Sequence, residues 1–303
     1  MIIEEVALRR TWTVANTGLS GGEIVLSGWD FGGDGEIAFL QHANGMCAAL
    51  WALVATQLTR RFRVIALDAR GHGDSQHLIV PSDYAWSAMV DDVISVTEQI
   101  LTEEGKSQIA LGLGSSFGGI LLAGAAAQAK DRFARLIMLD PPIHPSEELI
   151  DKMGIDYTAP LASKPDMIEQ TLKRKYIWDS RESARQAWKD KALFSVWDSR
   201  AFDLYLQAGM KDLPDGRVEL KCHPTVEAHI FATTGSLGLF DYAPHVDIPV
   251  ELVHAAKGFF TYDFYRHIAA VFPNCSLSQL QGGHMLPFES PDRVVELVFD
   301  TCR

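Results

Sequence analysis

The sequence predicts an α/β fold in which a mostly parallel sheet carries helices on both faces. Two observations lead to this prediction. Short apolar runs alternate with longer helical patterns along most of the 303 residues, as in sheets whose parallel strands are joined by helices. One of these runs ends in a Gly-x-Ser-x-Gly motif at Gly114–Gly118 and passes directly into a helical pattern, which is a strand–turn–helix arrangement.

The first half of the chain supplies six of eight expected strands. The first two, which we expect to pair antiparallel, are Val6–Val14 and Glu23–Trp29. The next four are Ile37–Gln41, Phe62–Asp68, Ser107–Leu113 and Phe133–Leu139. The helices expected between them are Met46–Thr59, Ser82–Thr102 and Gly119–Lys130, with Ser82 as the N-cap of the second.

The rhythm of strand and helix is interrupted from His144 to about Leu237. Four stretches there have helical patterns rich in Trp, Lys, Arg and Glu: Lys164–Trp178, Arg181–Trp197, Arg200–Ala208 and Pro224–Thr234. We therefore expect a core domain of residues 1–142 and 238–303 with a helical insertion at 143–237, a second independent domain being the alternative. The rhythm then returns with strands Val250–His254 and Leu277–Gln281 and helices Tyr262–Val271 and Asp292–Thr301.

Composition and charge narrow the classes of partner. The formal net charge of −12 argues against nucleic acids and anionic membranes, because both attract clustered Lys and Arg. No window reaches the roughly 18 apolar residues of a membrane span, and the acidic start lacks a secretory pattern, so we expect a cytoplasmic protein. The four cysteines show no metal-ligand spacing and are expected as free thiols. A homodimer is left open.

Ser116 stands at the centre of the Gly-x-Ser-x-Gly motif and is the candidate nucleophile. Glycines on either side let a strand and a helix approach closely around a strained corner, which pushes the hydroxyl of Ser116 into a cleft. A serine hydroxyl is a poor nucleophile at neutral pH. It needs a base to take its proton and donors to hold the oxyanion that forms.

His284 is the candidate base, although the chain has ten histidines. It follows Gly282-Gly283 on the loop between the last expected strand and the last helix. That loop opens at the carboxyl edge of the sheet, where ligands bind in open α/β folds.

The acid that orients such a base has to lie between residues 116 and 284 in the chain order Ser, Asp or Glu, His. Asp140, at the end of the strand after the nucleophile helix, is our first choice. Asp263 is the alternative beyond the strand Val250–His254, and another acid or none also stays open. A carboxylate at this place fixes the tautomer of the base and stabilises the imidazolium.

Two main-chain amides are the expected oxyanion donors. One is the N–H of Phe117, directly after the nucleophile and at the positive end of its helix. The other comes from the loop after Ile37–Gln41, where Asn44 is preferred and Met46 is second choice. His42 is expected to organise that loop, and the run Asp68–Ser75 to form a scaffold turn.

Together these residues resemble the α/β-hydrolase superfamily, in the branch that holds small carboxylesterases, haloalkane dehalogenases and epoxide hydrolases. The motifs are Gly114-Ser-Ser-Phe-Gly118, His42-Ala-Asn-Gly45, Asp68-x-Arg-Gly-His-Gly-x-Ser75 and Gly283-His-x-x-Pro-x-Glu-x-Pro291. The resemblance covers residues 25–142 and 245–303, and the block between matches the family's helical cap. It implies an α/β-hydrolase fold with an eight-stranded sheet and no metal or organic cofactor.

The resemblance also bears on the site. The family's commonest acid position corresponds to Gly258 here, whereas Asp140 fits the arrangement of some dehalogenase-like members. Dehalogenases and epoxide hydrolases use an Asp nucleophile, so Ser116 argues against both activities.

We therefore expect a serine hydrolase acting on a small-molecule acyl compound, first of all a carboxylic ester. Lactones, thioesters, amides and some carbon–carbon bonds are alternatives for the same residues, and a ligand receptor with little turnover is the alternative of another class. Five aromatic residues of the insertion are candidates either to line an acyl pocket or to pack its helices together: Trp178, Trp188, Phe194, Trp197 and Tyr205.

Overall fold

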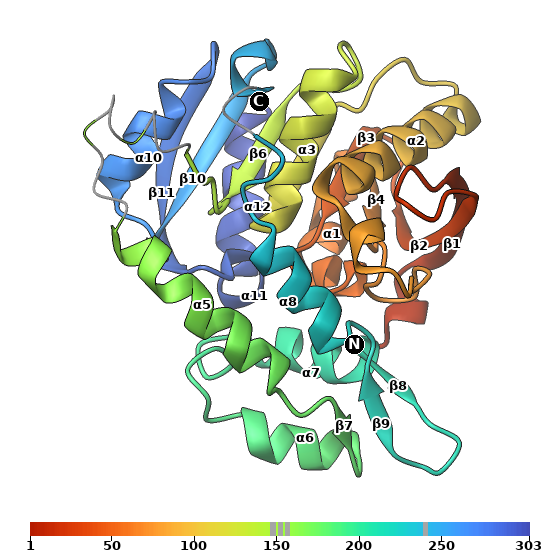
Figure 1. Cartoon of the computed structure of the whole chain (residues 1–303). Helices are drawn as coiled ribbons and strands as arrows, with labels where there is room; N and C mark the ends of the chain where they lie inside the picture. Colours follow the sequence, from red (N-terminus) through yellow and green to blue (C-terminus); the bar gives the residue numbers. More distant parts are fainter. Residues whose placement is uncertain (146–149, 151–153, 155–157, 239–241) are drawn as a thin grey trace.

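A computed structural model describes the chain except for residues 146–149, 151–153, 155–157 and 239–241. Its main feature is an eight-stranded sheet in the order β1-β2-β4-β3-β5-β6-β10-β11 (Figure 1). The strands are β1 Leu8–Ala15, β2 Glu23–Gly32, β3 Glu36–Gln41, β4 Phe62–Leu67, β5 Leu111–Ser115, β6 Leu136–Leu139, β10 Val250–Lys257 and β11 Cys275–Gly283. β2 runs antiparallel to β1 and β4, and the other neighbours pair in parallel.

Helices cover both faces of this sheet (Figure 1). They are α1 Ala52–Leu58, α2 Trp86–Glu104, α3 Phe117–Gln128, α10 Tyr262–Ala269 and α12 Pro291–Thr301. Successive side chains of a strand point to opposite faces. In β3, Phe39 belongs to the hydrophobic cluster that includes side chains of α2, α3 and α10, whereas Leu40 belongs to the cluster that includes those of α1 and α12. The α/β-hydrolase architecture expected from the sequence is confirmed.

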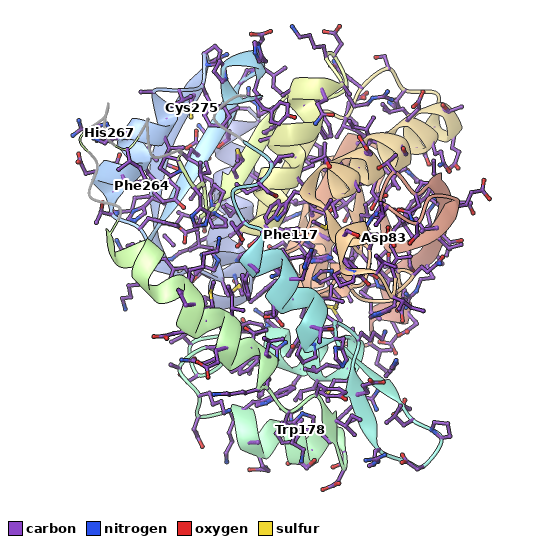
Figure 2. All side chains as sticks on the ribbon, viewed as in Figure 1. Asp83, Phe117, Trp178, Phe264, His267 and Cys275 are labelled. Atoms are coloured by element: carbon purple, nitrogen blue, oxygen red, sulfur yellow. The ribbon has the colours of Figure 1, made fainter. Side chains whose placement is uncertain are left out.

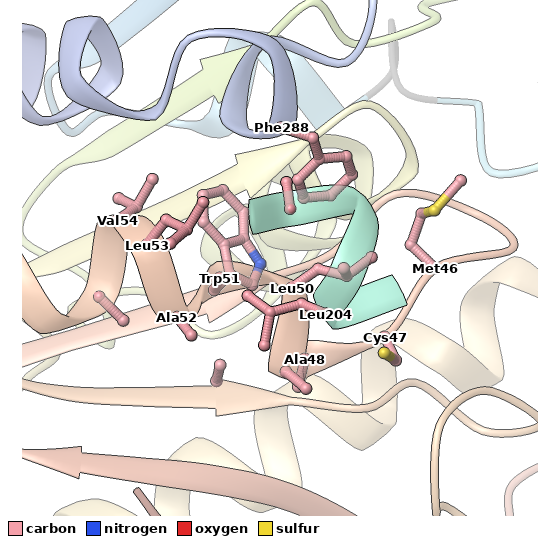
Figure 3. Packing of buried hydrophobic residues seen from close by; sticks show 14 of the residues in the cluster. Met46, Cys47, Ala48, Leu50, Trp51, Ala52, Leu53, Val54, Leu204 and Phe288 are labelled. Atoms are coloured by element: carbon pink, nitrogen blue, oxygen red, sulfur yellow. The ribbon is translucent and has the colours of Figure 1, made fainter. Parts of the chain in front are cut away.

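Short helical turns complete the core: η1 Ile3–Glu5, η2 Ala48–Trp51, η3 Pro81–Tyr84, η4 Ala243–His245 and α11 Leu286–Glu289. Figure 3 shows residues of η2 and α1 in one hydrophobic cluster, to which Phe288 of α11 also belongs. Leu204 belongs to the same cluster and comes from α7 (Ser199–Ala208), in the part of the chain between β6 and β10.

The expected N-cap at Ser82 is wrong. Ser82 lies inside η3, and α2 begins at Trp86 with Ala85 as an N-cap that offers no side-chain hydrogen bond. The neighbouring Asp83 is turned away from the helix end, because its carboxylate accepts hydrogen bonds from the main-chain N–H and the hydroxyl of Ser20 at 2.8 and 2.6 Å. A long-range contact thus replaces local capping.

Between β6 and β10 the chain leaves the sheet. The described elements there are α5 Thr158–Leu172, β7 Ile177–Trp178, α6 Arg181–Trp188, α7 Ser199–Ala208, β8 Met210–Asp212, β9 Val218–Leu220 and α8 Pro224–Ala232. They lie together at the lower side of the sheet in Figure 1, and Figure 2 shows Trp178 within them and Phe117 near the middle of the molecule. We refer to residues 158–238 as the inserted segment.

The inserted segment is less purely helical than expected. β7, β9 and β8 form a small antiparallel sheet, so the helix expected over Lys164–Trp178 ends at Leu172. The helix expected over Arg181–Trp197 ends at Trp188. The chain between β8 and β9 turns at Asp215-Gly216, where Gly216 has φ 85°; Asp-Gly between two strands is a hairpin signal.

Candidate active site

Ser116 occupies a tight corner between β5 and α3. Its φ of 52° and ψ of −119° are unusual for a residue with a side chain. Both flanking glycines are sterically required. A Cβ on Gly114 would lie 2.5 Å from the nitrogen of Gly119, and one on Gly118 would lie 2.2 Å from the carbonyl oxygen of Gln41. Glycine is therefore needed at 114 for β5 to meet α3, and at 118 for α3 to pack against the end of β3.

His284 reaches this corner from the loop after β11. Its Nε2 lies 2.8 Å from the Oγ of Ser116, and its Nδ1 lies 2.7 Å from the Oδ2 of Asp140. With Nδ1–H donating to the carboxylate, Nε2 is left as an acceptor for the serine hydroxyl. The three side chains come from three separate loops at the carboxyl edge of the parallel strands.

Asp140 is fully buried and directly follows β6. Its Oδ1 accepts a hydrogen bond of 2.9 Å from the N–H of Ala255, which leaves Oδ2 for His284. Its backbone has a positive φ of 45°. A Cβ on Gly258 would lie 2.5 Å from Oδ2 of Asp140, so the carboxylate fills the space that a side chain at 258 would need.

Asp263, the alternative acid, lies in the first turn of α10 and its side chain is 69% exposed. Its carboxylate pairs with Arg266 at 3.2 Å and lies 3.7 Å from Nε2 of His267, both on the same helix. The structure therefore brings Asp140, and not Asp263, to His284.

Asn44 and Phe117 stand at the two positions expected for oxyanion donors. Phe117 is the first residue of α3, so its N–H has no acceptor within the helix. A turn follows β3, in which the N–H of Met46 donates to the carbonyl oxygen of Ala43 at 3.1 Å and Gly45 has φ 78°. This bond occupies the amide of Met46, the second choice, and does not use the N–H of Asn44.

The side chain of Asn44 ties this loop to the inserted segment. Its Nδ2 donates to the carbonyl oxygen of Glu227 in α8 at 3.0 Å. The carboxylate of Glu227 pairs with Arg174 and packs against Gly45, where a Cβ would lie 2.7 Å from its Cδ. Sequence reasoning missed Glu227, because only the fold places residue 227 beside residue 45.

Two buried histidines brace the same loop from the other side. The N–H of Gly45 donates to Nε2 of His72 at 3.1 Å, while Nδ1 of His72 lies 3.0 Å from the carbonyl oxygen of Arg70. The N–H of Ala69 donates to Nε2 of His42 at 3.0 Å. Burial lowers the pKa of His42 to about 4 and that of His72 well below its usual value. Both rings are neutral, each accepting from an amide.

Asp68 connects the residues that follow β3 with the turn at residues 68–75, as expected of a scaffold turn. Its Oδ1 accepts from the N–H of Ala48 at 2.6 Å and its Oδ2 from the N–H of Asp74 at 3.1 Å. Burial raises the pKa of Asp68 to about 6. Nearby, Arg70 is buried and its guanidinium pairs with Asp92 at 2.6 Å.

The neutral state of His42 predicts a pH effect on stability. Above pH 6.5 the ring is neutral in both folded and unfolded chains; between pH 6.5 and 4 only the unfolded chain gains the proton, so stability falls as pH falls. Wild type should therefore lose unfolding free energy between pH 7 and pH 5. In His42→Gln, this loss should be smaller by roughly 2 kcal/mol. Denaturant unfolding of both proteins at the two pH values measures this difference.

Asp68 acts in the opposite direction, because a raised carboxyl pKa stabilises the folded chain as pH falls through about 6. It is present in both proteins and cancels from the comparison. An identical pH dependence in wild type and His42→Gln would contradict a neutral, buried His42.

The five aromatic residues of the inserted segment pack against one another. Ring centroids are 5.3 Å apart for Trp178 and Trp188, 5.4 Å for Trp188 and Phe194, and 5.6 Å for Phe194 and Tyr205. Trp197 lies 5.1 Å from Phe194. These contacts support the second alternative, that the five rings pack the inserted segment together.

A small cavity with a volume of about 10 Å³, the room of one water molecule, lies beside α3 and the residues that follow β6. Its lining includes Ile120, one helical turn along α3 from Ser116, and Pro142, two residues beyond Asp140. Trp86, Ile143 and Leu237 make it largely apolar.

In the part of the chain that the structure describes, no helix has the length and apolar character of a membrane span. The same part holds no group of three or more His, Cys, Asp or Glu side chains placed to bind a metal ion.

Comparison with known proteins places this architecture. A family model described as the alpha/beta hydrolase family matches residues 37–297. Among curated relatives, an abhydrolase domain-containing protein, AKT2, of Alternaria alternata is 29% identical over 116 residues, covering 36% of this chain and 39% of that protein. A type I acyl-CoA thioesterase, mpaH, of Penicillium roqueforti (strain FM164) is 34% identical over 118 residues, covering 39% of this chain and 24% of that protein.

A pimeloyl-[acyl-carrier protein] methyl ester esterase of Aliivibrio salmonicida is 31% identical over 109 residues, covering 36% of this chain and 37% of that protein. These alignments thus span less than two-fifths of each curated relative. Likeness in structure extends further: an E-2-(acetamidomethylene)succinate hydrolase superposes with a TM-score of 0.74 at 16% identity, covering 96% of this chain and 98% of that one. From the family match over most of its length and this fold, the chain belongs to the alpha/beta hydrolase family.

Proposed function

We propose that this chain is a serine hydrolase that cleaves an acyl bond of a small molecule, first of all a carboxylic ester, through an acyl-enzyme. One observation carries the proposal: Ser116 Oγ, His284 and Asp140 form a continuous relay with contacts of 2.8 and 2.7 Å. Such a relay turns a weakly acidic hydroxyl into a nucleophile, because the base takes the proton as the bond to carbon forms.

Acylation begins when Ser116 Oγ attacks the carbonyl carbon and its proton passes to Nε2 of His284. The imidazolium that results is stabilised by the Asp140 carboxylate at its Nδ1–H. When the tetrahedral intermediate collapses, the bond from carbon to the leaving oxygen breaks and Nε2–H donates its proton to that oxygen. The alcohol leaves and the acyl group stays on Ser116.

The negative charge of the tetrahedral oxygen needs fixed donors. The N–H groups of Phe117 and Asn44 take this role in the proposal, supported by their position at the start of α3 and in the turn after β3. The dipole of α3 adds positive potential at the same point.

Deacylation repeats these steps with water as the nucleophile. His284 takes a proton from the water as its oxygen bonds to the acyl carbon. The bond to Ser116 Oγ then breaks and the serine oxygen regains a proton from His284. The products are the free carboxylic acid and the original enzyme.

The names of the curated relatives support acyl transfer and add a second candidate. One is a methyl ester esterase and another an acyl-CoA thioesterase, both acting on acyl carbonyl groups. A thioester is therefore the second candidate substrate. Hydrolysis of matched p-nitrophenyl esters, thioesters and anilides of equal acyl chain length separates these bond types, and turnover of none of the three would oppose the proposal.

Asn44→Ala tests whether the side chain of Asn44 holds the turn that carries the proposed oxyanion donor. The variant keeps the main-chain N–H of residue 44 but loses the hydrogen bond to Glu227 that holds the turn. We expect kcat to fall about tenfold, about 1.4 kcal/mol, with a smaller change in KM, because the oxyanion exists only in the transition state.

Asn16→Ala is the matched control for this variant. Asn16 is also buried and hydrogen-bonded, but its partners are Gly18, Gly21 and Arg70. Its loss should lower stability and leave kcat of the folded enzyme unchanged. An Asn44→Ala enzyme with wild-type kcat would show that the side-chain bond to Glu227 is not needed to hold the N–H of residue 44 in place.

A further inference from the structure

Glu289 holds the main chain on both sides of the candidate base. Its Oε2 accepts a hydrogen bond from the N–H of Gly283 at 2.5 Å, and its Oε1 accepts one from the N–H of Met285 at 3.2 Å. We propose that Glu289 is a positioning residue, which fixes the two peptide groups flanking His284 and thereby keeps the imidazole aligned. This inference rests on the proposed role of His284 as the base.

The amides that Glu289 binds lie where regular structure cannot satisfy them. Gly283 is the last residue of β11, and Met285 precedes the short helical turn α11. A peptide N–H left unpaired at such a junction lets the local backbone rotate. Because His284 lies between the two, rotation of either peptide would swing its Cβ away from Ser116 and Asp140.

The geometry also explains the small residue before the base. A Cβ on Gly283 would lie 2.6 Å from Oε1 of Glu289. The carboxylate therefore packs directly against the main chain of the loop, and a side chain at 283 would displace it.

Glu289 is itself held firmly. It ends α11, whose Leu286, Pro287 and Phe288 are buried. The carbonyl oxygen of Phe288 accepts a hydrogen bond of 2.8 Å from the N–H of Asp198, at the start of α7. The rings of Trp197 and Phe288 lie 4.9 Å apart, and Phe288 belongs to the same hydrophobic cluster as Trp51 (Figure 3). The inserted segment and the core thus both contact the turn that carries Glu289.

A carboxylate suits this place better than an amide. Two N–H donors converge on residue 289, and a carboxylate offers two acceptor oxygens. A glutamine of the same shape would turn an NH₂ group toward one of the two donors. Glu289→Gln therefore breaks one of the two hydrogen bonds without removing packing volume.

The experiment compares Glu289→Gln with Glu296→Gln, which changes an exposed carboxylate on α12. For each folded protein, kcat and KM are measured on the best ester, together with the low-field proton NMR resonance of the His284 Nδ1–H bonded to Asp140. We expect Glu289→Gln to lower kcat 10- to 100-fold with little change in KM, since small misplacements of reacting groups carry losses of this size. The low-field resonance should shift or disappear, and Glu296→Gln should match wild type.

Two results would overturn the inference. One is a folded Glu289→Gln enzyme with kcat within twofold of wild type and an unchanged resonance. The other is a loss of activity that matches only the fraction of unfolded protein, since that is what a purely structural role would produce. If Glu289→Gln does not fold, Glu289→Asp is measured in the same way, because its shorter side chain reaches only one of the two amides.

The resonance separates this inference from the proposed function. It reports the His284–Asp140 hydrogen bond without any substrate. Should wild type hydrolyse no acyl compound while the resonance still depends on Glu289, the proposed function fails and the positioning role stands. Should wild type be active and Glu289→Gln be indistinguishable from it, only the positioning role fails.

Discussion

Ser116→Ala is expected to lower kcat by about 10⁴- to 10⁶-fold on any ester that the wild type hydrolyses. The hydroxyl is the group that forms the acyl-enzyme, and its Oγ is the only atom lost next to Nε2 of His284. KM should change little, because substrate binding does not need the hydroxyl. Steady-state kinetics measure the effect, and circular dichroism and thermal unfolding verify that each variant is folded.

Ser115→Ala is the matched control. Ser115 adjoins the nucleophile and is equally buried, yet among the described residues no hydrogen-bond partner reaches its Oγ. Removing a buried hydroxyl without a partner leaves stability unchanged or improves it. We expect this variant to keep wild-type kcat. Equal losses in Ser115→Ala and Ser116→Ala would point to damage at the corner rather than to loss of the nucleophile.

Asp140→Asn carries the second largest expected effect, a drop of about 10⁴-fold in kcat. The amide keeps the shape of the carboxylate but cannot hold His284 in the tautomer with hydrogen on Nδ1. It also removes the negative charge that stabilises the imidazolium. The same kinetics, with Asp263→Asn as the control acid, test the assignment, because Asp263 is exposed and its carboxylate pairs with Arg266 of α10.

Gly258→Ala probes the same carboxylate from its other side. An added Cβ would meet Oδ2 of Asp140 at 2.5 Å, so the variant should displace the atom that binds His284. We expect kcat to fall while the buried Oδ1 contact to Ala255 retains the fold. Full activity of Asp140→Asn, or loss of activity in Asp263→Asn instead, would contradict the choice of acid.

The central strands β3, β4, β5 and β6 could be predicted because they are short, apolar and mostly buried. Each of the eight expected strands overlaps an observed one, from β1 to β11. The periodicity of apolar residues is a local property of the sequence, so it can be recognised without knowing which elements pack against the strand. The corner around Ser116 could also be predicted, because Gly114 is needed where two consecutive elements, β5 and α3, meet.

The inserted segment was harder to predict. β7 is two residues long and its pairing with β9 joins positions about forty residues apart, so no local pattern indicates it. The capping error at Ser82 has a similar cause, because Asp83 bonds to Ser20 across the fold. The early part of the insertion expected at 143–237 lies partly outside the described residues.

The parts of the site that sequence reasoning missed all depend on tertiary contacts. Asp140 could be named as an acid, but only the fold shows that its carboxylate takes the space beside Gly258. Glu289 was visible within a motif, yet its role follows from two main-chain donors that a sequence does not locate. Likewise, Glu227 reaches the turn at Asn44 from a different part of the chain.

Covalent labelling tests the central claim most directly. The wild-type enzyme is incubated with an alkyl fluorophosphonate, and the adduct is located by peptide mass spectrometry. A relay from Asp140 through His284 to the hydroxyl of Ser116 predicts one adduct per chain, on Ser116, with a labelling rate that falls sharply in His284→Ala. Folded protein that takes up no label, or carries it on another residue at the same rate with and without His284, would contradict the account.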